Sequence, residues 1–161
     1  MAQRPPRWLS DAELTAWRGW LDAHAVLSAA LNRELQRCSG LSLADYDVLV
    51  SLTDVPERSL RMYELGDRLQ WEKSRLSKQV SRMAARGLLE RRECLDDRRG
   101  AFVDLTAAGE RAITEAAPAH VEFVHDVVFD GLTPEQVEAL AAVSQLVQAR
   151  LASMSSTASD A

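Results

Sequence analysis

Cysteine and long apolar runs are the scarcest features of this 161-residue chain. Only Cys38 and Cys94 occur, too few for a disulfide framework, and neither has a CxxC or Cys/His spacing that would bind zinc. No eighteen apolar residues run together, and the opening MAQRPPRWLSDAEL lacks an apolar signal core. The sequence therefore predicts neither a membrane span nor secretion, and it indicates a cytoplasmic protein with reduced thiols and no membrane partner.

Motifs for catalysis are also missing. The chain has three histidines, no glycine-rich phosphate loop and no G-x-S-x-G nucleophile motif, which leaves little from which to build an active site. The apolar share of 47% and the charged share of 27% are those of an ordinary folded protein. We therefore expect a binding protein without a cofactor rather than an enzyme.

Charge is unevenly distributed along the chain. Residues 68–99 hold ten basic and five acidic side chains, a local charge of +5, whereas the whole chain carries −5, so the remainder carries −10. An electropositive segment on an acidic body is typical of proteins that bind a phosphate-bearing partner.

Apolar periodicity and capping signals divide the chain into helices around one short hairpin. Ser10 opens a helix over residues 11–37 through a capping box, and Ser42 with Asp45 opens a second helix that stops before Pro56. Further helices are expected over residues 61–69, 73–86, 107–129 and 133–152, with Pro118 kinking or splitting the fifth. The tail 153–161 is small and polar, and we expect it to be disordered.

The helix expected over residues 73–86 has two chemically different sides. Leu76, Val80 and Met83 form one inward stripe. The opposite side has three cations, two hydroxyls, one methyl group and no carboxylate, from Ser74, Arg75, Lys78, Ser81, Arg82 and Ala85. Guanidinium groups bind guanine edges or phosphates, and small side chains let a helix enter a groove deeply. Together with the short helix and tight turn before it, this helix predicts a helix-turn-helix that reads DNA.

An arginine-rich tip follows in the chain. Residues 88–95 and 101–105 predict a β-hairpin, with Val103 and Leu105 on one face and Phe102 and Asp104 on the other, and Thr106 caps the next helix. A hairpin directly after a helix-turn-helix is typical of a wing. The arginines at residues 98 and 99 would then reach a neighbouring minor groove, where narrow A·T-rich DNA concentrates negative potential.

The hairpin sequence D-R-R-G-A-F-V-D-L-T, residues 97–106, resembles the wing signature D-x-R-[AG]-x-x-V-x-L-T of the multiple antibiotic resistance regulator (MarR) family. Upstream, S-R-M at residues 81–83 and R-G-L at residues 86–88 are similar to the end of that family's recognition helix. The order of elements resembles the family over essentially the whole chain. One departure is W-E at residues 71–72, where many members cap the recognition helix with Ser or Asp.

The resemblance implies a mainly α fold with a small β-hairpin wing, a winged helix-turn-helix with N- and C-terminal dimerisation helices. Residues 1–161 would form a single MarR-like unit, with a DNA-binding lobe over 40–106 and a helical dimerisation region over 10–38 and 107–152. The implied function is transcriptional regulation, as a repressor, by a homodimer on a pseudo-palindromic operator in double-stranded DNA. The DNA-binding residues that it implies are Lys73, Ser74, Arg75, Ser77, Lys78, Arg82, Arg98 and Arg99, with Asp97 supporting the wing.

An aromatic strip on the first helix suggests where an effector would bind. Trp17, Trp20 and His24 recur at i, i+3 and i+7, and Tyr46 of the second helix is a further candidate wall. The resemblance implies a small aromatic ligand at such a pocket. Ordinary packing in the core or at a dimer interface is the alternative interpretation of the same residues.

Three other functions stay open. Cys38 or Cys94 could make the chain a redox-sensing regulator, because a neighbouring arginine favours a reactive thiolate. A metal sensor would use residues of the fifth helix, although the histidine pair has a poor helical spacing; the set is His120, Glu122, His125 and Asp126. A winged helix that prefers structured RNA to duplex DNA is the third alternative.

Overall fold

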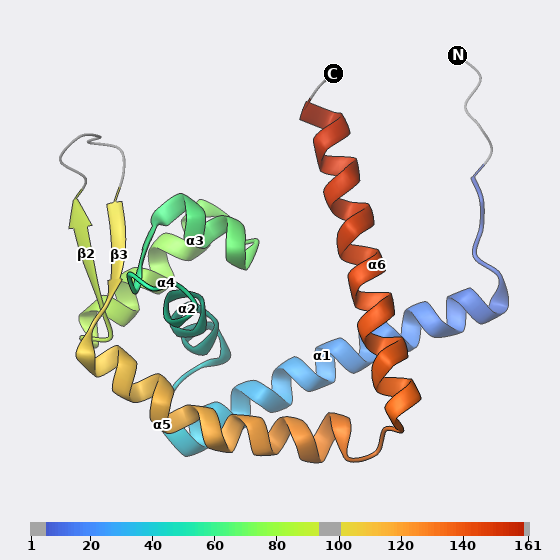
Figure 1. The fold of residues 1–161 in the computed structure, drawn as a ribbon, viewed down its shortest axis with the longest axis horizontal. Helices are drawn as coiled ribbons and strands as arrows, with labels where there is room; N and C mark the ends of the chain where they lie inside the picture. The colour runs from blue at the N-terminus through green and yellow to red at the C-terminus, as the bar shows by residue number, and fades with distance from the viewer. Residues whose placement is uncertain (1–5, 94–100, 160–161) are drawn as a thin grey trace. The chain divides into compact units, whose positions relative to one another are not determined.

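The computed structural model describes residues 6–93 and 101–159, and the chain forms two compact units, Met1–His120 and Val121–Ala161. Figure 1 shows a mainly helical protein with a small sheet, as the sequence predicts. The first unit holds α1 (Asp11–Ser39), α2 (Leu43–Thr53), β1 (Ser59–Arg61), α3 (Met62–Leu69), α4 (Lys73–Ala85), β2 (Leu89–Glu93), β3 (Ala101–Leu105) and most of α5 (Ala107–Val124). None of the helices among the described residues combines the length and apolar character that crossing a membrane requires.

The helix starts confirm the capping signals of the sequence. The Ser10 hydroxyl accepts a hydrogen bond from the backbone N–H of Glu13 at 3.3 Å, and the Glu13 carboxylate accepts one from the Ser10 N–H at 2.8 Å. Ser42 and Asp45 repeat this reciprocal pair at the start of α2. Gly40 ends α1 at φ 69°, a left-handed conformation that glycine adopts without steric penalty. These caps satisfy backbone groups that a helix end leaves unpaired.

The wing belongs to a three-stranded antiparallel sheet in the order β1-β3-β2. Val103 of β3 is fully buried and lies opposite Leu60 of β1, whereas Phe102 lies opposite Arg61 and Arg92 on the other face. The predicted alternation of the hairpin is thus confirmed. The strand β1 was not expected from the sequence, because three residues are too short to show a period and their pairing with β3 joins distant parts of the chain.

The core of the first unit lies where α2, α3 and α4 pack on one face of this sheet (Figure 1). Each fully buried aliphatic side chain there stabilises the fold by about 2 kcal/mol. The largest fully buried side chains of the core are Leu35, Leu41, Leu49, Leu52, Leu65, Leu76, Met83, Val48, Val80 and Val103. This core holds α4 by the stripe that its sequence pattern predicts, and it leaves the opposite side of α4 to solvent.

Two expectations about the later helices need correction. Of the two effects expected of Pro118, a kink or a split, the split is wrong, because α5 continues through this residue to Val124. In the second unit a π-helical turn, η1 (His125–Phe129), precedes α6 (Pro134–Ser159), whose start has the predicted box between Thr133 and Gln136. The helix does not end near Ala152, so residues 153–159 are helical rather than a disordered tail. Small polar residues continue a helix because their propensity is only a few tenths of a kcal/mol below that of better formers.

Candidate nucleic-acid interface

The solvent side of α4 is the predicted cationic surface. Leu76, Val80 and Met83 are buried, which fixes the rotation of the helix on the core. The opposite positions are all exposed: Ser74, Arg75, Lys78, Ser81, Arg82 and Ala85. We call these six residues the outer face of α4. Its cations, hydroxyls and small side chains are accessible together, without a carboxylate among them, and this suits a duplex groove lined by phosphates.

Arg75 is held near the start of α4 by an aromatic ring. Its guanidinium carbon lies 4.1 Å from the ring centroid of Trp71, a cation–π distance. Burial raises the pKa of the Asp47 carboxyl, and the positive charge of Arg75 partly offsets that shift. The Trp71 ring, one residue before the N-cap of α4, therefore restrains a predicted DNA-binding side chain. The Glu72 carboxylate makes no capping hydrogen bond to the helix start.

Arg82 is connected to a buried polar cluster beneath α4. Its Nη2 donates to Oε1 of Gln79, and the Gln79 Nε2 donates to Oδ1 of Asp45 at 2.6 Å. Gln79 and Asp45 are only 3% and 4% exposed. The sequence prediction missed Gln79, although its position three after Leu76 places it on the inward stripe.

Asp45 is also paired with Arg86 at the end of α4. The distance between Arg86 Nη1 and Asp45 Oδ2 is 2.7 Å, and Arg86 Nη2 donates to the Gly40 carbonyl at 3.0 Å. Burial by itself would raise the pKa of the Asp45 carboxyl, but the hydrogen bonds from Ser42 and Arg86 outweigh burial and bring the pKa below its ordinary value. The carboxylate is therefore ionised in the folded protein at neutral pH. It ties the α1–α2 junction to Gln79 in the middle of α4 and to Arg86 at the C-terminal cap of that helix.

The base of the wing has its own set of arginine contacts. The Arg92 guanidinium donates two hydrogen bonds to Asp104, at 3.1 and 3.2 Å, and the Ser59 hydroxyl donates to the same carboxylate. The guanidinium carbons of Arg61 and Arg92 lie 4.8 and 4.6 Å from the centroid of the Phe102 ring. These cross-strand contacts fix the outer face of the sheet.

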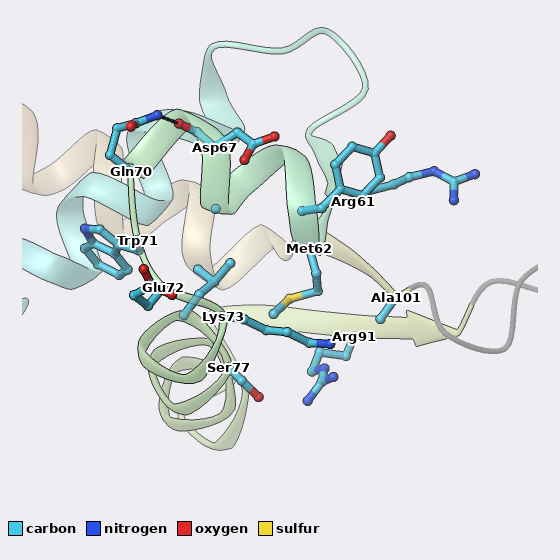
Figure 2. A pocket seen from close by; sticks show the side chains of 13 residues that line it. Arg61, Met62, Asp67, Gln70, Trp71, Glu72, Lys73, Ser77, Arg91 and Ala101 are labelled. Carbon is cyan, nitrogen blue, oxygen red and sulfur yellow. Dashed lines mark hydrogen bonds between the residues drawn. The ribbon is translucent and has the colours of Figure 1, made fainter. Parts of the chain in front are cut away.

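A hollow of about 550 Å³ separates the start of α4 from the wing strands (Figure 2). Lys73 and Ser77 line it from α4, and Arg91 lines it from β2. In Figure 2 the side chain of Lys73 extends toward Arg91 across this hollow. Arg91 lies opposite Val103 in the sheet but is exposed. The sequence analysis did not name it as a binding residue, because the alternation of a strand does not show which exposed side chains border a hollow. Two cations from different elements thus border the same opening.

Four residues that the sequence analysis singles out, Cys94, Asp97, Arg98 and Arg99, lie outside the described residues. The other thiol, Cys38, is free and exposed, and its Sγ lies 3.8 Å from the Leu35 carbonyl oxygen.

The predicted effector residues differ in their surroundings. Trp17 and Trp20 are 52% and 46% exposed and His24 is also exposed, whereas Tyr46 is buried in the first unit. Burial raises the pKa of the Tyr46 hydroxyl. None of these four residues lines the hollow of Figure 2.

His120 is the aromatic neighbour of Tyr46. The two ring centroids are 4.3 Å apart, and Nδ1 of His120 is buried without a hydrogen-bond partner. Burial lowers the pKa of this imidazole, which favours its neutral form. Among the residues that the structure describes, no three His, Cys, Asp or Glu side chains gather closely enough to hold a metal ion.

Comparison with known proteins places this geometry in a family. The sequence profile described as "MarR family" matches residues 39–100. A search of curated protein sequences returned no match. Among solved structures, the chain is similar to Sco3205, a MarR family transcriptional regulator from Streptomyces coelicolor in complex with DNA, at 39% identity over 91% of each chain and a TM-score of 0.85.

Two further structures agree. AbsC, a MarR family transcriptional regulator from the same organism, is 36% identical over 92% of this chain and 99% of its own, with a TM-score of 0.84. A mutant of MarR from E. coli complexed with operator DNA shares the fold at 21% identity, over 88% of this chain and 99% of its own, with a TM-score of 0.75. The winged helix, its matching profile and its similarity to Sco3205 and AbsC establish that the chain belongs to the MarR family of transcriptional regulators.

Proposed function

We propose that this regulator binds DNA in a sequence-specific manner and that α4 enters the major groove. The observation that carries the proposal is the outer face of α4, which presents Arg75, Lys78 and Arg82 to solvent while the opposite stripe is buried. Guanidinium forks at this position can pair with guanine edges, and lysine can contact phosphates. The complexes of Sco3205 with DNA and of a MarR mutant with operator DNA support the same use of this fold.

The remaining predicted contacts extend this interface. Lys73, Ser74 and Ser77 lie in the first turns of α4, where backbone N–H groups also favour phosphate oxygens. Arg91, across the hollow from Lys73, is a further candidate for a phosphate contact. Arg98 and Arg99 of the wing tip would reach the minor groove, with Asp97 orienting one of them.

The acting species in this proposal is a homodimer on a pseudo-palindromic operator. Exposed apolar side chains recur along α6, and the stripe consists of Leu140, Val143, Leu146, Val147 and Leu151. Trp17, Trp20 and Leu21 are similarly exposed on α1. A second copy of the chain would bury such surface and would set two α4 helices about 34 Å apart, one turn of B-DNA.

Regulation would then consist of repression that a small aromatic effector relieves. Trp17, Trp20 and His24 offer exposed ring faces, and Tyr46 lies in the lobe that carries α4. A ligand that binds one dimer arrangement more tightly than another would shift the spacing of the recognition helices.

The alternative is regulation by oxidation at a cysteine. Cys38 is exposed and free, which a sensing thiol requires. The adjacent Arg37, however, forms its ion pair with Glu34 at 2.5 Å. Peroxide treatment should abolish operator binding in the wild type and leave a Cys38→Ser variant unaffected if this mechanism operates. An equal response of both proteins would reject Cys38 as the sensor.

Titration of a duplex selected by the wild-type protein tests the DNA interface. Arg75→Ala should weaken binding by about 1–3 kcal/mol and relax the preference for one base, whereas Lys78→Ala should weaken binding on every sequence and reduce the salt slope by about one per lost contact. Arg33→Ala, an exposed position on α1, is the control and should change neither quantity. Unchanged affinity in both α4 variants would contradict the proposed role of the helix.

The dimer has a separate test. Leu146→Glu places a carboxylate in the exposed apolar stripe of α6 and should shift the protein to monomers in sedimentation velocity, with loss of operator binding. Gln145→Glu adds the same charge to the opposite side of α6 and should leave the dimer intact. A Leu146→Glu protein that stays dimeric would exclude this stripe from the interface.

A further inference from the structure

We infer that Gln79 is a positioning residue for DNA binding, which holds the Arg82 guanidinium in place while Asp45 holds Gln79. The inference rests on the proposed function of Arg82 at the DNA interface. It concerns a buried residue that contacts no DNA in this arrangement, since Gln79 is 3% exposed.

Hydrogen-bond chemistry fixes the direction of this relay. Asp45 is ionised, so its carboxylate only accepts hydrogen bonds. The Gln79 amide must therefore turn its NH₂ group toward Asp45, where the N–O distance is 2.6 Å. Its carbonyl Oε1 is consequently directed the other way and accepts from Arg82 Nη2. Asp45 and Arg82 thus favour the same orientation of the amide, because the first only accepts and the second only donates.

Asp45, which orients Gln79, is itself held in place by hydrogen bonds. Asp45 accepts from the Ser42 backbone N–H at 2.9 Å and from Arg86 at 2.7 Å. Arg86 in turn donates to the Gly40 carbonyl at the end of α1. Buried polar groups such as those of Asp45 and Gln79 favour one geometry, because leaving any of them without a hydrogen bond is costly. A continuous series of hydrogen bonds therefore connects the α1–α2 junction to Arg82 on the outer face of α4.

Pre-ordering Arg82 has a consequence for affinity. A long exposed arginine loses rotamer freedom when it binds, and a side chain already restrained loses less. One N–H of the five on the guanidinium goes to Gln79, and the planar group can present others to a phosphate or a guanine edge. Removing the acceptor on Gln79 should therefore weaken DNA binding through Arg82 alone.

A double-mutant cycle on the selected duplex tests this dependence. Gln79→Met keeps the size of the side chain and removes the acceptor, so it should weaken binding about three- to fivefold, and Arg82→Ala about tenfold. In the Arg82→Ala background, Gln79→Met should cause no further loss, because the group that it positions is gone. The control cycle pairs Gln79→Met with Lys78→Ala, whose losses should multiply. Equal, independent losses in both cycles would overturn the relay.

A measurement on the free protein separates this inference from the proposed function. Arginine Nε nuclear spin relaxation should show a restrained Arg82 side chain in the wild type and a mobile one in Gln79→Met, with circular dichroism confirming that the variant is folded. A mobile Arg82 in the wild type would overturn the relay even if Gln79→Met does not fold. A wild-type protein that selects no DNA but has a restrained Arg82 would overturn the DNA-binding proposal and leave the positioning intact.

Discussion

Substituting Gly109 with alanine should destabilise the junction between the wing and α5, because this glycine has no room for a Cβ atom. A Cβ built at Gly109 would lie 2.2 Å from the Leu88 carbonyl oxygen and 2.8 Å from Cδ1 of Leu105. The Leu88 oxygen cannot move away easily, because it accepts a hydrogen bond from the Thr106 N–H at 3.3 Å and shares the Thr106 hydroxyl proton, at 2.9 Å, with the Gly87 carbonyl. Relief of the contact would stretch those bonds, each worth about 1 kcal/mol, in addition to an overpacking penalty of about 1–3 kcal/mol.

We therefore expect Gly109→Ala to lower the free energy of unfolding by about 3 kcal/mol and the Tm by about 6–12 °C. Gly19→Ala is the matched control, because it also lies in a helix but its added Cβ would meet nothing within 4 Å. There the better helix propensity of alanine should raise stability by about 0.5–1 kcal/mol. Thermal and urea unfolding, both at one protein concentration, measure the pair. A Gly109→Ala protein as stable as Gly19→Ala would refute the packing described for this junction.

Three further changes have distinct expected results. Arg86→Ala leaves the buried Asp45 carboxylate without its charged partner and should lower the free energy of unfolding by about 2 kcal/mol in urea titrations. Arg37→Ala breaks only an exposed ion pair and should have almost no effect. Similar losses in the two variants would contradict the stabilising role of the Arg86–Asp45 pair. In the folded protein the pKa of His120 lies below its ordinary value of 6.5, so the unfolded chain binds a proton more readily than the folded protein does. With respect to this group, the fold is therefore most stable above pH 6.5, and it loses stability as the pH falls from there toward the pKa of the folded state. His120→Phe should flatten the pH dependence of stability from pH 7 to about 5, and an unchanged profile would contradict the burial of the neutral ring. Trp71→Leu removes the aromatic ring that contacts the Arg75 guanidinium. The variant should fold but should show a weaker base preference on the selected duplex. An unaltered base preference would exclude a role of Trp71 in restraining Arg75.

Much of the fold could be predicted because its signals are local. The spacing of Leu76, Val80 and Met83 predicts the rotation of α4, and the Ser42–Asp45 box predicts the start of α2. Both depend on residues within one or two helical turns, so a sequence pattern contains all the necessary information. The outer face of α4 follows directly, because its positions are those that the buried stripe excludes.

The features that sequence reasoning missed depend on distant partners. The strand β1 exists because Ser59–Arg61 pairs with β3, more than forty residues later in the chain. In the sequence, Gln79 is a polar residue that interrupts the apolar stripe of α4, and its role becomes clear only from its hydrogen bond to Asp45 of α2. The wheel position of Gln79 was the available signal, since a polar residue on an inward stripe requires a buried partner. Its partner could not be chosen from several polar residues without the packing of α2 on α4.

Selection of duplexes from a random DNA pool tests the central claim most directly. The purified wild-type protein, confirmed as folded, would be incubated with the pool at about 150 mM salt, where nonspecific phosphate binding is weak. The account predicts enrichment of an inverted repeat whose half-sites are about one helical turn apart. Arg75→Ala, selected in parallel, should enrich a less defined half-site. Folded wild-type protein that enriches no sequence would contradict the claim that the outer face of α4 reads DNA.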